Sequence, residues 1–127
     1  MIITIRTQKS LGEVRQALED SVSENRWTLL GMHDVGERLR AKGLVFERKL
    51  YVYELCNPSV AKQVLDADVQ IGTALPCRVS VYTDRGGVVL ETIRPTALLA
   101  LFNRPELADL AKETEKTIRK IMEQAAE

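Results

Sequence analysis

Apolar residues alternate with polar ones, or form short β-branched and aromatic runs, at five places along this chain. Both patterns are typical of β-strands. The predicted strands cover residues 2–6, 27–34, 49–56, 77–83 and 88–94. The sequence Asp84-Arg85-Gly86-Gly87 separates the last two runs and predicts a tight hairpin, because glycine accepts the backbone angles that such turns require.

Apolar spacings of three and four residues predict helices between and after these strands. Ser10 and Glu13 have the spacing of a capping box at the start of the first helix. Asn57 is a strong N-cap and Pro58 suits the first helical position, so a second helix should follow. Pro105 should open the terminal helix. The apolar faces expected for the first and last helices are Leu11, Val14, Leu18 and Val22, and Leu107, Leu110, Thr114, Ile118, Ile121 and Ala125.

Two further segments have weaker patterns. Residues 35–43 are compatible with a short helix that ends at Gly43, where glycine accepts a left-handed C-cap. Residues 96–102 are apolar on nearly every side, which predicts either complete burial or a patch covered by a partner. We expect this segment to contribute to a dimer interface, and a groove for a small apolar ligand is the alternative.

The order of these elements predicts an α+β fold built as β-α-β-β-α-β-β-α. We expect a mostly antiparallel five-stranded sheet with helices packed on one face. The 127 residues fit a single domain, 1–127, with no linker or repeat. The second face of such a sheet stays open unless a partner or ligand covers it.

Composition narrows the function classes. The 18 Lys and Arg residues balance 18 Asp and Glu residues, so a nucleic-acid partner is not expected. No apolar run approaches the roughly twenty residues that span a bilayer, and no signal peptide is recognisable, so we expect no membrane partner and a cytoplasmic location. Phosphate-loop and metal-site patterns are absent, and no cofactor is predicted. Five basic residues form a loose cluster that we interpret as a solvated turn: Arg38, Arg40, Lys42, Arg48 and Lys49.

The two cysteines are 21 residues apart, which is neither a redox Cys-x-x-Cys pair nor, with His33 as the only histidine, a zinc site. In a reducing compartment both should be free. Cys77 follows Pro76 and shares its strand face with Val79 and Val81, so we expect a buried, inert thiol.

Cys56 ends a strand directly before a helix N-terminus, where free N–H groups lower a thiol pKa. Glu54 should share the face of Cys56 and act as a base or a ligand. In the other interpretation, Cys56 packs beneath the helix and Glu54 is solvated. His33 should share a face with Trp27, Leu29 and Gly31 and lie at the surface or half-buried, because one histidine forms neither a catalytic triad nor a metal centre.

Three ordered motifs connect the chain to a known family: Glu54-Leu55-Cys56-Asn57-Pro58, Leu75-Pro76-Cys77-Arg78-Val79, and Arg94-Pro95 followed by Phe102-Asn103. The chain resembles the bacterial and archaeal family of unknown function numbered 302. The resemblance implies an α+β fold similar to one half of the TATA-binding-protein architecture, and a homodimer that joins two sheets. It supplies no catalytic residues.

The sequence therefore leaves the function unknown and the question of enzymatic activity undecided. Our first hypothesis is a homodimeric domain that binds a small molecule in a groove near the cysteines. The candidate ligand-binding residues are Glu54, Cys56, Asn57, Pro76 and Cys77. The alternatives are a thiol-dependent enzyme or redox or metal-handling protein that uses Cys56, and, by fold analogy alone, nucleic-acid binding.

Overall fold

The chain forms one five-stranded sheet in the order β1-β5-β4-β3-β2, and every neighbouring pair of strands is antiparallel. The computed structural model describes all residues, 1–127. The elements are β1 (Ile2–Thr7), α1 (Leu11–Glu24), β2 (Thr28–Asp34), α2 (Val35–Ala41), β3 (Leu50–Cys56), α3 (Pro58–Ala67), the 3₁₀ helix η1 (Val69–Ala74), β4 (Cys77–Asp84), β5 (Gly87–Ile93), α4 (Pro95–Ala100), the 3₁₀ helix η2 (Pro105–Leu107) and α5 (Ala108–Ala126).

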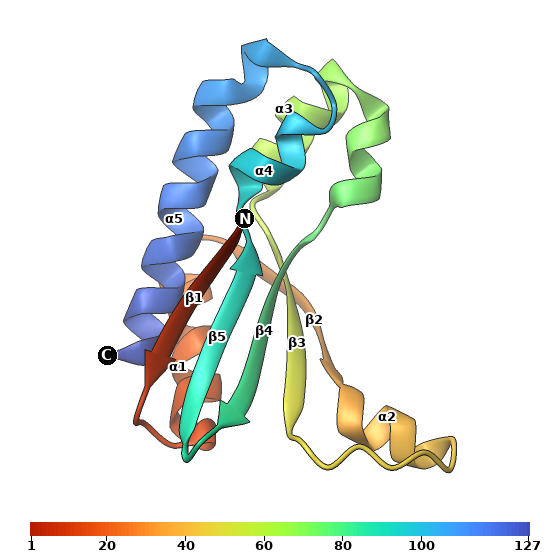
Figure 1. Cartoon of the computed structure of the whole chain (residues 1–127). Helices are drawn as coiled ribbons and strands as arrows, with labels where there is room; N and C mark the ends of the chain where they lie inside the picture. Colours follow the sequence, from red (N-terminus) through yellow and green to blue (C-terminus); the bar gives the residue numbers. More distant parts are fainter.

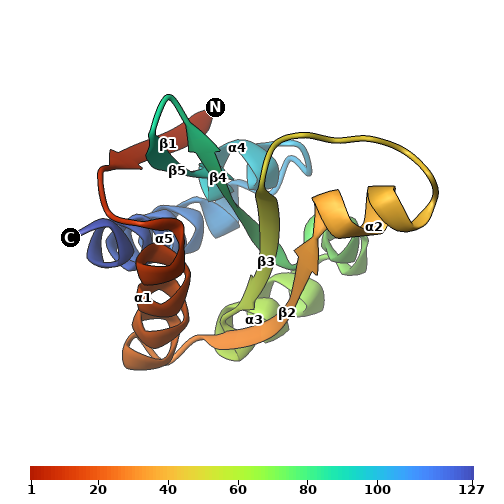
Figure 2. The ribbon, with the colours of Figure 1, turned by 90° about the horizontal axis from the view of Figure 1, so that it is seen from below.

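The two longest helices, α1 and α5, lie side by side against one face of the sheet (Figures 1 and 2). The shorter α3, η1 and α4 gather beyond one end of the sheet, and α2 lies beside the opposite end of β2 and β3 (Figure 1). The predicted α+β class with an antiparallel five-stranded sheet is confirmed. The shorter helices connect strand ends and do not span the sheet.

Local sequence signals account for the ends of several elements. The Ser10 hydroxyl accepts a hydrogen bond from the Glu13 amide while the Glu13 carboxylate accepts one from the Ser10 amide, so the predicted capping box is present. The Asn57 side chain accepts from two amides at the start of α3. In the β4–β5 turn, Arg85 and Gly86 have φ values of 53° and 82°, as a type I′ hairpin requires.

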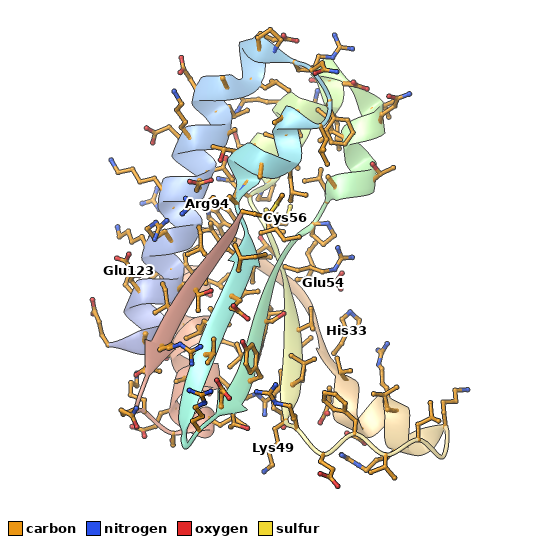
Figure 3. All side chains as sticks on the ribbon, viewed as in Figure 1. His33, Lys49, Glu54, Cys56, Arg94 and Glu123 are labelled. Atoms are coloured by element: carbon orange, nitrogen blue, oxygen red, sulfur yellow. The ribbon has the colours of Figure 1, made fainter.

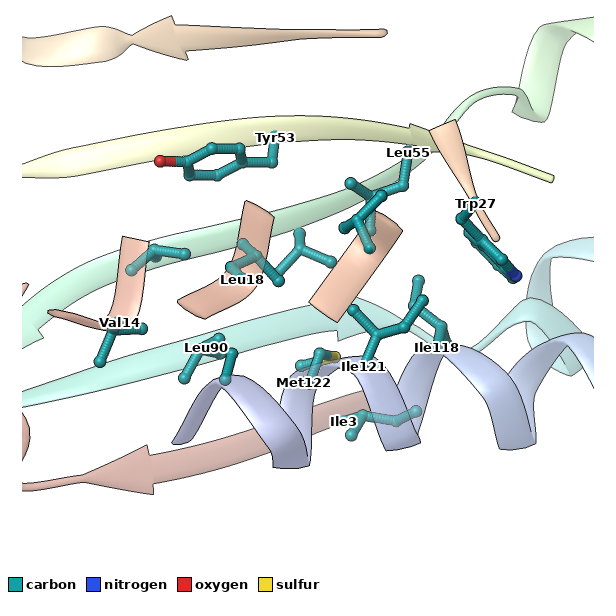
Figure 4. Packing of buried hydrophobic residues seen from close by; sticks show 14 of the residues in the cluster. Ile3, Val14, Leu18, Trp27, Tyr53, Leu55, Leu90, Ile118, Ile121 and Met122 are labelled. Carbon is teal, nitrogen blue, oxygen red and sulfur yellow. The ribbon is translucent and has the colours of Figure 1, made fainter. Parts of the chain in front are cut away.

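The main hydrophobic core fills the space between the sheet and the helix pair α1 and α5 (Figure 4). Leu18 from α1, Leu90 from β5 and Ile121 from α5 are completely buried there. The apolar faces predicted for the first and last helices supply much of this core. A second, smaller cluster of buried residues comprises Val64, Ile71 and Leu107.

The apolar segment that follows β5 is a short helix, α4, which the predicted order of elements lacked. Leu99 and Phe102 pack against the smaller cluster, and Leu101 at the end of the helix is 73% exposed. Part of this segment's apolar surface is therefore covered within the chain itself, by α5 and η1.

Strand β2 contains an irregularity that the alternation pattern does not show. The register with β3 shifts between Leu29 and Gly31, as a β-bulge produces. Leu29 consequently packs against the core, as does Trp27 just before the strand, whereas His33 pairs with Val52 on the opposite face. The predicted common face of His33 with Trp27 and Leu29 is wrong, because the extra residue reverses the alternation. The prediction of a half-buried His33 is confirmed.

Candidate functional site

The sheet face opposite α1 and α5, here called the open face, carries most of the clustered polar side chains. No helix crosses this face (Figure 2). Alternation along the strands places Glu54 of β3, Glu91 of β5 and Arg78 of β4 on it, since Leu55, Leu90 and Val79 face the core. The bulge in β2 adds His33 to the same face.

Glu54 lies at the centre of the first polar cluster. Its Oε1 is 2.9 Å from His33 Nε2, and its Oε2 accepts a hydrogen bond from Arg78 Nη2 at 3.5 Å. The Glu54 side chain is only 20% exposed. Gly31 lies opposite Glu54 in the register, and a Cβ there would approach Glu54 Oε1 to 3.4 Å. A Cβ at Gly31 would therefore be in ordinary van der Waals contact with the carboxylate, which lies close to the β2 backbone.

The imidazole of His33 is oriented by this carboxylate. Its Nδ1 is buried and has no hydrogen-bond partner. The contact with Glu54 therefore engages Nε2 alone and fixes the orientation of the ring. The pair thus helps to organise the polar side chains of the open face.

A second polar cluster lies beside loop 42–49. Glu91 accepts hydrogen bonds from the Tyr82 hydroxyl at 2.6 Å and from the Thr4 hydroxyl at 2.8 Å. The hydrogen bond to Glu91 and partial burial raise the pKa of Tyr82. The guanidinium of Arg48 lies over the Tyr82 ring, 5.0 Å from its centre. A cavity of about 270 Å³ separates the loop from the sheet, lined by Phe46, Arg48, Leu50, Ser80, Tyr82 and Glu91.

The predicted site around the cysteines is small. Cys56, Asn57, Pro76 and Cys77 line one cavity together with Trp27, but its volume is about 20 Å³. That volume accommodates one water molecule, which needs about 10–15 Å³. Glu54, the fifth predicted residue, lies apart from this cavity, toward His33 (Figure 3). The five predicted residues therefore lie in two places: four line the cavity at the end of the sheet, and Glu54 lies on the open face.

Both cysteines are free and half-buried. Cys77 packs against the main core, as predicted. Burial, with a smaller contribution from the neighbouring Cys56, raises the pKa of the Cys77 thiol to about 11. Cys77 is thus almost entirely a neutral thiol at physiological pH, which disfavours it as a nucleophile. The Asn57 side-chain oxygen is occupied by the Ser59 and Val60 amides and is not free for a ligand.

Sequence reasoning missed the cluster of His33, Glu54 and Arg78. The pairing of Glu54 with Arg78 follows from the β3–β4 register, which depends on contacts 24 residues apart. The position of His33 depends on the β2 bulge. The one local signal was Gly31, since a glycine inside a strand often marks a bulge or a close approach.

These features define an α+β domain whose antiparallel sheet is covered by two helices on one face and bears a paired polar network on the other. Residues 3–125 match the family described as Domain of unknown function DUF302, and the chain belongs to that family. The predicted resemblance is confirmed. No curated protein sequence matches the chain.

Among solved structures, the chain is similar to the uncharacterized conserved protein DUF302 from Bacillus stearothermophilus. The two share 29% sequence identity, the alignment covers 98% of this chain and 97% of the other, and the TM-score is 0.92. The family and this neighbour thus establish the fold, and neither description identifies a specific function. In the structure, none of the helices combines the length and the apolar character needed to cross a membrane.

Proposed function

We propose that the protein is a non-catalytic binding domain that acts as a homodimer, with a second copy covering the open face. The observation that carries the proposal is a pair of exposed isoleucines on this uncovered and otherwise polar face. Ile2 and Ile93 are paired neighbours in β1 and β5 and are 46% and 43% exposed. Both point away from the core, since Ile3 and Leu90 face it.

The charges of the open face also suit a two-fold interface. Arg6 and Arg78 contribute two positive charges, and Glu54 and Glu91 contribute two negative ones. A two-fold dimer places the same patch against itself, so each patch must carry both signs to avoid repulsion. An equal mixture of cations and anions meets that condition, whereas it offers no support for binding nucleic acid.

Sedimentation equilibrium at micromolar concentration tests the dimer. We expect twice the mass of one chain for the wild-type protein and the mass of one chain for Ile93→Glu. The new carboxylate would lie unpaired in the interface beside Glu91. Val69→Glu is the matched control, since Val69 is 79% exposed on η1, beyond the end of the sheet. Its dimer should persist. Circular dichroism checks that each variant is folded.

Two results would contradict the proposal. A monomeric wild-type protein would remove it altogether. A folded Ile93→Glu variant that stays dimeric would show that the copies meet elsewhere, for instance along a sheet edge, as the implied TATA-binding-protein-like arrangement would require.

Thiol chemistry at Cys56 is the second candidate function. It is supported by one observation: Cys56 is free and directly precedes Asn57, the N-cap of α3. Helix N-termini stabilise thiolates. Ligand binding by Glu54, Cys56, Asn57, Pro76 and Cys77 stays a prediction, although the cavity of about 20 Å³ leaves little room for a molecule larger than water.

A further inference from the structure

A hollow with a partly apolar lining lies away from both the cysteines and the open face. It lies between α4, the following turn and the start of α5, and is called here the α4–α5 groove. Its volume is about 370 Å³. Its lining includes Leu99, Ala100, Asn103, Leu107, Ala108 and Lys112. We propose that this groove binds a small molecule with a carboxylate at one end and a short apolar body.

The shape of the groove follows from small residues on two facing helices. Ala100 on α4 and Ala108 and Ala111 on α5 leave space that larger side chains would fill. Leu99 and Leu107 supply apolar walls. The volume lies at the lower end of the range for small-molecule sites, about 300–1,000 Å³, so the ligand must be small.

The groove is held in place by contacts between α4 and α5. The backbone amide and the hydroxyl of Thr96 donate to Glu115 Oε1 at 3.3 and 2.7 Å, and the Arg94 guanidinium donates to Glu115 Oε2 at 3.0 Å. Arg94, the N-cap residue of α4, forms no side-chain capping bond, so Glu115 provides the cap from the neighbouring helix. A preformed wall reduces the ordering cost of binding.

The rim carries one positive charge that the chain itself does not compensate. Arg104 Nε is 3.3 Å from Asp68 Oδ2, and Arg104 Nη1 is 4.0 Å from Glu106. Lys112 forms neither an ion pair nor a hydrogen bond with any group of the chain, and the Asn103 side chain likewise has no hydrogen-bond partner. One free ammonium group and one free amide beside an apolar hollow match a single carboxylate.

Hexanoate is a suitable probe, with hexylamine and 1-hexanol as controls of the same chain length. In ¹H–¹⁵N spectra of the whole chain we expect hexanoate to cause saturable shifts that centre on residues 96–112. Hexylamine should cause none, and 1-hexanol should bind at least tenfold more weakly, because hydrogen bonds to a charged group are the stronger ones. Titration of the Ile93→Glu variant gives the same result if the groove is independent of the dimer.

Two kinds of variant test the positive charge at the rim and the volume of the groove separately. Lys112→Gln should weaken hexanoate binding about tenfold. Lys116→Gln, one turn further along α5 and outside the groove, should leave it unchanged. Ala108→Leu should abolish binding by filling the hollow from its exposed rim, and Ala100→Leu is a second filling variant. Absence of saturable shifts, equal binding of hexylamine, or unchanged affinity in Lys112→Gln would overturn the proposal.

Discussion

The two hydrophobic clusters of this protein differ in how completely they fill their space. The main core between the sheet and the helix pair contains 15 buried residues, whereas the cluster among the short helices contains three. Around the smaller cluster lie a cavity of about 40 Å³ and the α4–α5 groove of about 370 Å³. The comparison shows that the space between the sheet and the helix pair α1 and α5 is filled more completely than the space among the short helices.

Helix length explains the difference. The helices α1 and α5 have 14 and 19 residues and present several turns of large side chains to the sheet. The helices α3 and α4 have 10 and 6 residues, which is about three turns and about two turns. Fewer side chains then interdigitate, and gaps remain between them.

The largest expected loss of stability follows from shortening a buried isoleucine. Ile121 and Ile71 are both completely buried, one in each cluster. We expect Ile121→Ala to lower the free energy of unfolding by about 4 kcal/mol and Ile71→Ala by about 2 kcal/mol, because the looser surroundings of Ile71 can relax into the space left behind. Urea unfolding measures both values. Equal losses would show that the two clusters are packed alike.

A smaller effect is expected at Glu115, which joins α4 to α5. Burial opposes its ionisation, but the hydrogen bonds from Thr96 and Arg94 outweigh it and keep the pKa of this carboxyl below its ordinary value. We expect Glu115→Gln to cost about 1 kcal/mol at pH 7. A lowered folded-state pKa stabilises the fold above the ordinary carboxyl pKa, and this stabilisation is lost as the pH falls through the lower, folded-state value.

The difference between the wild type and Glu115→Gln should therefore shrink in acid, as unfolding curves at several pH values below about 4.5 would show. The exposed Glu113 forms no side-chain hydrogen bond, so Glu113→Gln is the matched control and should change stability little. A constant difference at every pH would mean that Glu115 acts through its shape alone.

The last prediction concerns the reactivity of Cys77, which borders both hydrophobic clusters. With a thiol pKa of about 11, Cys77 should react with iodoacetamide more than a hundredfold slower at pH 8 than an ordinary thiol of pKa about 8.5. Its rate should still rise above pH 10. Mass spectrometry of each cysteine gives both rates. A plateau for Cys77 below pH 9 would contradict the prediction, and a rate for Cys56 equal to that of a model thiol would remove the thiol function.

Local patterns predicted much of the fold. The strand runs, the Ser10–Glu13 capping box, the Asn57 cap and the Asp84–Gly87 turn each depend on residues within a few positions of one another, and each is present. The site was predicted less well. The cavity beside Cys56 and Cys77 exists but is small, and Glu54 belongs to a different cluster.

The amino-acid sequence alone determined where the strands and the long helices lie and which of their faces are apolar, because periodicity and capping act over one or two turns. Only the tertiary structure decided that β1 pairs with β5, that His33 meets Glu54 and that Glu115 caps α4. These contacts join residues 19 to about 90 positions apart. They depend on strand order, on a bulge and on helix packing, which no local pattern in the chain encodes.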